Sequence, residues 1–314
     1  KKNMPDTEVI VGDITDDKTK DRIITESKLK GVNMIIGGPP CQGFSMKGKK
    51  LGLNDPRNFL FMEYLNLVQE IQPEVFVIEN VKSLLNTAGG WFKDEILNYI
   101  HKLGYKVQYG VLNAKKFGVP QARERAIFIC SKHKDITLPK GNECMVTVRD
   151  AISDLAYLQS AEGEFEQEYI TAPKTEYQKF MRKGSKHLYN HKASAHSEKA
   201  LEKLAMIPAE KGKECLPEEL WGKQKFNTTW GRLVWDEVSP TIDTRFDTPS
   251  NGTNSHPELN RAITPREAAR IQSFDDNFVF YGSKFYIRSQ IGNAVPPLLA
   301  EAIADRIWEM YRNE

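Results

Sequence analysis

A cysteine in turn-forming sequence is the first candidate for covalent chemistry in this chain. Cys41 follows Gly38-Pro39-Pro40 at the end of the apolar run 33–37, where glycine and proline favour a rigid, exposed bend. An isolated cysteine is most often a buried core residue, but an exposed one near arginines can have a lowered pKa and act as a nucleophile. The sequence therefore indicates a nucleophilic thiolate at position 41.

Two further candidate sites carry ionisable side chains beside apolar runs. Glu79 directly follows the run 74–78, and Arg123 and Arg125 directly precede another run. In open α/β sheets the reactive residues gather where the strands end at their carboxyl termini. By themselves these three residues would be interpreted as an ordinary ion pair at strand ends. Beside Cys41 they indicate a catalytic group.

The elements that must position these residues follow an alternating pattern. Short, continuous apolar runs, typical of strands buried on both faces of a sheet, are separated by segments with helical spacing of apolar residues. The runs are 8–12, 33–37, 74–78 and 126–130. We expect an α/β fold with a doubly wound, mostly parallel sheet.

The alternation stops between residues 145 and 262, where charged stretches and three tryptophans lie among turn residues. Order returns at Thr264-Pro265-Arg266-Glu267, where Thr264 and Glu267 predict a capping box and Pro265 suits a first helical turn. We therefore expect a catalytic domain over 1–145, a smaller irregular domain over 146–285, and a return to the first domain over 286–314.

Composition excludes several classes of protein. The chain has 314 residues, and no apolar run approaches the roughly 18 residues that span a bilayer. Its four cysteines form no Cys-x-x-Cys pair, so we expect neither a metal site nor disulfides. The net charge is only +2, but lysines cluster after Cys41 and over 174–192, as a nucleic-acid partner would require. We expect a cytoplasmic protein with no membrane partner.

Five segments, in order, resemble the motifs of the cytosine-C5 DNA methyltransferases. Gly38-Pro39-Pro40-Cys41-Gln42-Gly43-Phe44-Ser45 is similar to that family's catalytic motif and Glu79-Asn80-Val81 to its next signature. Gln121-Ala122-Arg123-Glu124-Arg125 matches its Gln-x-Arg-x-Arg motif. The segments 261–272 and 291–296 resemble its last two motifs. Together they cover nearly the whole chain.

The resemblance implies methyl transfer from S-adenosylmethionine to C5 of cytosine, with S-adenosylhomocysteine as product. It implies that Cys41 adds to C6 of the base, that Glu79 holds and protonates N3, and that Arg125 binds the base carbonyl. Arg123 is expected to support Glu79 or Cys41. A proton-donating carboxyl needs a raised pKa, which burial would supply.

The resemblance also implies sites for the donor and for DNA. The target base must be flipped out of the duplex, and the segment from Ser45 to Asn58 is expected to be the family's mobile loop. The implied donor-binding residues are Asp13, Ile14, Pro40, Leu60, Asn293 and Val295. The implied DNA-binding residues are Gln42, Ser45, Lys47, Lys49, Arg57, Arg232 and Thr241.

The sequence departs from the family pattern at one point. It has no Phe-x-Gly-x-Gly loop, which in the family holds the methionine end of the donor. We expect roughly 60–80 further residues upstream, the length of two βα units, or a second chain that supplies them. A cognate restriction endonuclease is another open partner. The alternatives are a methyltransferase-like DNA-binding subunit that needs a partner and a tRNA cytosine-C5 methyltransferase.

Overall fold

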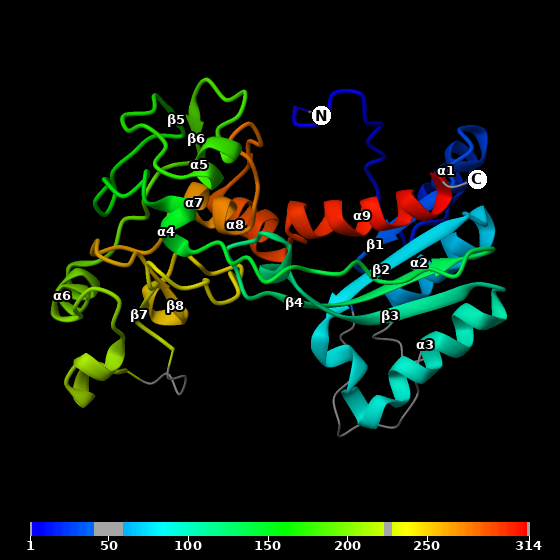
Figure 1. Ribbon diagram of the computed structural model, residues 1–314, viewed down its shortest axis with the longest axis horizontal. Coiled ribbons are helices and arrows are strands. Elements are labelled where there is room, and N and C mark those ends of the chain that lie inside the picture. The colour runs from blue at the N-terminus through cyan, green and yellow to red at the C-terminus, as the bar shows by residue number, and fades with distance from the viewer. Residues whose placement is uncertain (1, 41–58, 223–227, 313–314) are drawn as a thin grey trace.

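The computed structural model describes residues 2–40, 59–222 and 228–312. Figure 1 shows two lobes, one built around a sheet and one with little regular structure. The elements of the sheet lobe are α1 (Asp17–Leu29), β1 (Met34–Gly37), α2 (Phe59–Ile71), β2 (Val75–Val81), α3 (Trp91–Lys102), β3 (Lys106–Asn113), β4 (Glu124–Ser131) and α9 (Pro297–Arg312). Those of the second lobe are α4 (Val148–Ile152), β5 (Glu166–Gln167), α5 (Glu176–Met181), β6 (Leu188–Tyr189), α6 (Glu198–Met206), β7 (Gly231–Arg232), β8 (Thr253–Ser255), α7 (Pro265–Ile271) and α8 (Lys284–Asn293).

The four strands of the sheet lie in the order β1-β2-β4-β3. β1 pairs with β2 in parallel, with Ile35 opposite Phe76. β4 is antiparallel to both β2 and β3. The described strands thus form a mixed sheet. β3 and β4 can be antiparallel neighbours since the connection between them is short and contains no crossover helix.

Helices cover both faces of the sheet, which confirms the α/β class. Phe76 and Ile78 of β2 pack with α2 and α3 on one face. Val75 and Val77, which alternate with them, pack with α9 on the other. This arrangement explains why β2 has a continuous apolar run in the sequence, since successive side chains enter two different cores. Figure 1 shows α9 and α3 on opposite sides of the strands.

The expected strand at 8–12 is wrong. This segment forms no strand in the structure, and Val11 is 88% exposed. No described strand lies beside it, and an apolar run becomes a strand only where it has a partner ladder. β1 is likewise an edge strand among those described, and its Ile36 is exposed.

The second lobe has its own apolar cluster, which runs from Val148 to Ile291 and includes α4, α7 and α8. The clusters of the sheet lobe resume at Val295. The predicted capping box at the start of α7 is confirmed, with Thr264 and Glu267 each bonded to the other's backbone.

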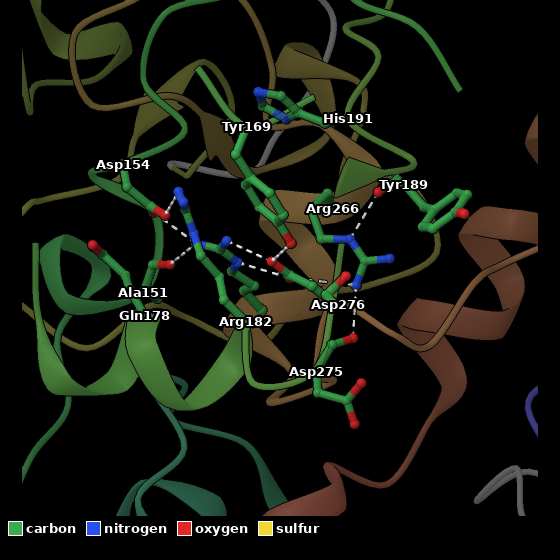
Figure 2. A network of polar contacts seen from close by, with 12 residues as sticks. Ala151, Asp154, Tyr169, Gln178, Arg182, Tyr189, His191, Arg266, Asp275 and Asp276 are labelled. Atoms are coloured by element: carbon green, nitrogen blue, oxygen red, sulfur yellow. Dashed lines mark hydrogen bonds and ion pairs between the residues drawn. The ribbon is translucent and has the colours of Figure 1, made fainter. Parts of the chain in front are cut away.

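Buried arginines connect the loops of this lobe, whose helices and strands are short. Figure 2 shows the network around α7. The Arg270 guanidinium donates two hydrogen bonds to the Asp276 carboxylate, at 2.9 and 2.7 Å, and a third to Asp154 at 2.6 Å. Arg182 also pairs with Asp154, and the Tyr169 hydroxyl donates to Asp276. Such buried charges are tolerated only when every partner is present, so the network fixes one arrangement of the loops.

Of the helices within the described ranges, none has both the length and the hydropathy needed to cross a bilayer.

Two buried histidines make the second lobe sensitive to mild acid. Burial lowers the pKa of His191 to about 4 and that of His256 to about 3, whereas an unfolded histidine titrates near 6.5. Between pH 6.5 and 5 the unfolded chain therefore binds more protons than the folded one, and the free energy of unfolding must fall as pH falls. We expect Tm, followed by circular dichroism, to drop across this window.

A matched pair of variants assigns this slope. His191→Gln should have a shallower fall in Tm between pH 6.5 and 5, while His187→Gln, at an exposed position, should keep the parent's slope. An unchanged slope in His191→Gln would contradict the assignment.

Candidate active site

Glu79 and Arg125 form the ion pair at the centre of the site. Glu79 lies near the carboxyl end of β2, and Arg125 lies on the neighbouring β4. The Nε of Arg125 is 2.7 Å from Oε1 of Glu79, and both side chains are largely buried. Burial raises the pKa of Glu79, while the charges of Arg125 and Arg123 act to lower it. The carboxyl can therefore hold a proton more readily than an exposed glutamate can.

The bend that precedes Cys41 is fixed against this pair. β1 and β2 are parallel, so both end at the same edge of the sheet. The Asn80 side-chain amide donates a hydrogen bond to the carbonyl of the buried Pro39 at 2.9 Å. A Cβ on Gly38 would lie only 2.9 Å from Oε2 of Glu79, so a side chain at this position would displace the carboxylate. Cys41 itself lies outside the described residues.

Arg123 acts on Glu79 through its charge and bonds elsewhere. It makes no hydrogen bond to Glu79 among the described atoms. Its buried guanidinium instead donates to the backbone carbonyls of Ile242, at 2.8 Å, and of Gly292, at 2.7 Å. Burial lowers its pKa to about 9. Arg123 acts on Glu79 only through its charge, and it joins the sheet lobe to two segments of the second lobe.

Two glutamines complete the contact between the lobes that Arg123 begins, which we call the seam. Neither of them has a role predicted from the sequence. Gln121 is fully buried, donates to the side chain of Gln272 at 2.9 Å, and accepts a hydrogen bond from the backbone of Ile242 at 2.9 Å. Gln272 in turn donates to the carbonyl of Ile291 at 2.7 Å. Both residues belong to the motifs already noted, which was the only signal the sequence offered.

Comparison with known proteins identifies the family. A family model of the C-5 cytosine-specific DNA methylases matches residues 1–309. The chain belongs to this family. It is 37% identical over 322 residues to the Type II methyltransferase M1.HphI of Haemophilus parahaemolyticus. The aligned region covers 99% of this chain and 77% of that relative. It is 36% identical over 340 residues to M.DdeI of Desulfomicrobium norvegicum, at 99% and 80% coverage.

Solved structures agree with this assignment. A prophage-encoded Escherichia coli protein assigned as a DNA modification methyltransferase is similar with a TM-score of 0.73 and 26% identity, over 96% of this chain and 86% of that one. The Dnmt2 methyltransferase of S. pombe, at 15% identity and a TM-score of 0.52, shares the fold. The reaction of this methyltransferase is the transfer of a methyl group to C5 of cytosine in DNA.

Three of the predicted donor-binding residues lie at the starts of α1 and α2. Asp13 and Ile14 lead into α1, and Leu60 lies in the first turn of α2. An ion pair between Lys20 and Glu63, at 3.3 Å, holds the first turns of these two helices together. The carboxylate of Asp13 is exposed, and hydrogen bonds from the backbone and side chain of Thr15 lower its pKa.

The remaining predicted donor-binding residues lie at three other places in the chain. Asn293 is exposed and follows Gly292, whose carbonyl accepts from Arg123. Val295 is partly buried against α9, so it contributes to the core in the described structure. Pro40 is exposed next to the anchored Pro39.

The prediction that Arg232 contacts DNA is wrong. Its side chain is buried, and its five N–H donors all bond within the second lobe. The acceptors are the carbonyls of Leu204, Ile207, His256 and Leu259 and the side chain of Asn260. The sequence offered an arginine beside a glycine but could not show that loops would close over it.

Thr241 does lie at the site. It is exposed, and its hydroxyl donates to the carbonyl of Ala122 at 3.0 Å, between Gln121 and Arg123 of the matched motif. The other predicted DNA-binding residues fall outside the described residues. They are Gln42, Ser45, Lys47, Lys49 and Arg57.

Gly292 tests the seam. A Cβ there would lie 2.5 Å from the carbonyl carbon of Asp243, and backbone cannot yield as a flexible side chain can. We expect Gly292→Ala to lower the free energy of unfolding by about 1–3 kcal/mol, as overpacking does, and to reduce methyl transfer. Gly252→Ala is the control, because its nearest neighbour would be a side-chain atom at 3.4 Å. Equal stability of the two variants, measured by urea unfolding, would contradict the close approach.

Proposed function

We propose that Cys41, Glu79 and Arg125 are the catalytic residues of this methyltransferase. The observation that carries the proposal is the buried Glu79–Arg125 pair at the strand edge to which the Pro39-Pro40 bend is tied. A carboxyl with a raised pKa is suited to donate a proton to N3 of cytosine, and the Arg125 guanidinium to bind the neighbouring carbonyl oxygen.

The covalent step requires the Cys41 thiolate, the proton of Glu79 and the methyl donor. The Cys41 thiolate adds to C6 while N3 takes a proton from Glu79, which leaves C5 electron-rich. After C5 has accepted the methyl group from S-adenosylmethionine, solvent takes the C5 proton and the C6–sulfur bond breaks, which returns the thiolate. N3 then gives its proton back to the Glu79 carboxylate. Arg125 stabilises charge on the base carbonyl throughout. Arg123 holds β4 against the second lobe through its two carbonyl contacts. This keeps Arg125, two residues further along the chain on β4, in contact with Glu79.

S-adenosylmethionine supplies an electrophilic methyl group when it is bound. The exposed carboxylate of Asp13, with its lowered pKa, is suited to accept hydrogen bonds from an adenine amino group, and the partly buried Ile14 and Leu60 are suited to contact the ring. The chain thus offers residues that fit the adenosine end of the donor. The open edge of β1 is where a strand that carries residues for the methionine end would pair, whichever polypeptide supplies it.

The second lobe, predicted from sequence as residues 146–285, is proposed as the domain that reads duplex DNA. Its exposed Thr241 lies against the Gln-x-Arg-x-Arg segment, which suits a contact beside the extruded cytosine. The names of M1.HphI and M.DdeI as Type II methyltransferases support a cognate restriction endonuclease as a functional partner.

Labelled methyl transfer to duplex DNA and to tRNA tests the function. We expect transfer to DNA and none to tRNA, and the loss of transfer in Cys41→Ser because the hydroxyl is far less nucleophilic. The parent should form a covalent complex with 5-fluorocytosine DNA, and Cys41→Ser should not. Full activity of Cys41→Ser would contradict the mechanism, and transfer to tRNA would favour the tRNA-modifying alternative.

The proton on Glu79 gives the reaction a pH limb. Because the carboxyl must be protonated to donate, we expect kcat to fall as pH rises above the raised pKa of Glu79. Glu79→Gln should lower kcat by roughly 10²-fold or more and remove this limb, since the amide does not titrate. A Glu79→Gln profile parallel to the parent's would show that the limb belongs to another group.

A further inference from the structure

The segment from Pro240 to Phe246 presents alternate side chains to the surface beside the catalytic pair. Ile242 and Phe246 are buried in the second-lobe cluster. Thr241, Asp243 and Arg245 are exposed. The three exposed side chains therefore project from the same stretch of chain whose buried side fixes the two lobes together.

Hydrogen bonds and a close backbone contact hold this segment in place. The backbone amide of Ala122 donates to the carbonyl of Ser239 at 2.8 Å, and Arg123 donates to the carbonyl of Ile242. Gly292, whose carbonyl also accepts from Arg123, lies in direct contact with the backbone of Asp243. Arg245 is therefore presented from a fixed base, four residues beyond Thr241.

The Asp243 carboxylate accepts from the Arg245 backbone, and no ion pair between the two side chains is present in the described structure. One oxygen of Asp243 accepts the backbone N–H of Arg245 at 2.6 Å, and the other accepts the side-chain amide of Asn251 at 2.8 Å. Both oxygens are thus used to shape the turn. Within the described ranges, no ion pair or hydrogen bond involves the guanidinium of Arg245. Arg232, in contrast, has all its donors satisfied inside the lobe.

We propose that Arg245 binds a backbone phosphate of the DNA strand next to the extruded cytosine. A guanidinium on a rigid support suits a phosphate because it can donate two parallel hydrogen bonds. Contacts of this kind position the duplex without reading its sequence. The inference rests on the proposed function, and it replaces the predicted contact at Arg232 with one from the surface of the same lobe.

Salt dependence of DNA binding tests the proposal directly. The dissociation constant of the full chain for a duplex that contains its methylation site is measured at several salt concentrations. Arg245→Ala should weaken binding and reduce the slope of log K against log salt by about one, since one fewer counterion is released. Arg245→Lys should retain the slope, because it keeps the charge, and bind with intermediate affinity. Arg306→Ala is the control, because its half-buried guanidinium lies on α9, bonded to Thr137 and paired with Glu309, and its loss should leave both quantities unchanged.

The outcomes separate this inference from the proposed function. If the parent neither binds nor methylates the duplex, the proposed function fails. If the parent does both and Arg245→Ala keeps its slope and affinity, only the phosphate contact fails. Weaker binding that is confined to one DNA sequence, with an unchanged slope, would make Arg245 a base-reading residue and overturn the proposal. Circular dichroism of Arg245→Ala should match that of the parent, because the side chain is exposed.

Discussion

The buried guanidinium of Arg123 is the constraint on which the site depends. A charged group removed from water must have acceptors, and those of Arg123 are carbonyls on two segments far apart in the sequence, at Ile242 and Gly292. The strand that carries Arg125 is thereby tied to the lobe that carries Thr241. The geometry of the Glu79–Arg125 pair and the docking of the lobes therefore depend on the same hydrogen bonds.

The electrostatics of Glu79 result from two opposed effects. Burial favours the neutral carboxyl, and the two nearby arginines favour the anion, with burial the larger effect. Because Arg123 donates its hydrogen bonds to backbone carbonyls, it stabilises the ionised Glu79 carboxylate less than a direct hydrogen bond would. From within the seam, its charge therefore opposes the raised pKa of Glu79 less than a direct contact would.

Sequence reasoning succeeded where the signal was local. The runs that became β1, β2 and β4, the capping box of α7 and the placement of Glu79 beside Arg125 all follow from short motifs and periodicity. It failed where burial depends on distant chain. The run at 8–12 has no described ladder partner, and Arg232 is enclosed by loops that start up to 28 residues away. The residues next to the run 8–12 and next to Arg232 carry no signal of these distant surroundings.

The arginine-centred interior of the second lobe has an evolutionary consequence. Arg232 and Arg270 hold the loops through hydrogen bonds to backbone carbonyls and to buried carboxylates, and the outward-facing side chains take no part in these bonds. Substitutions on that outer surface can accumulate while the lobe still folds. Enzymes of one ancestry can in this way acquire different outer surfaces on the same interior.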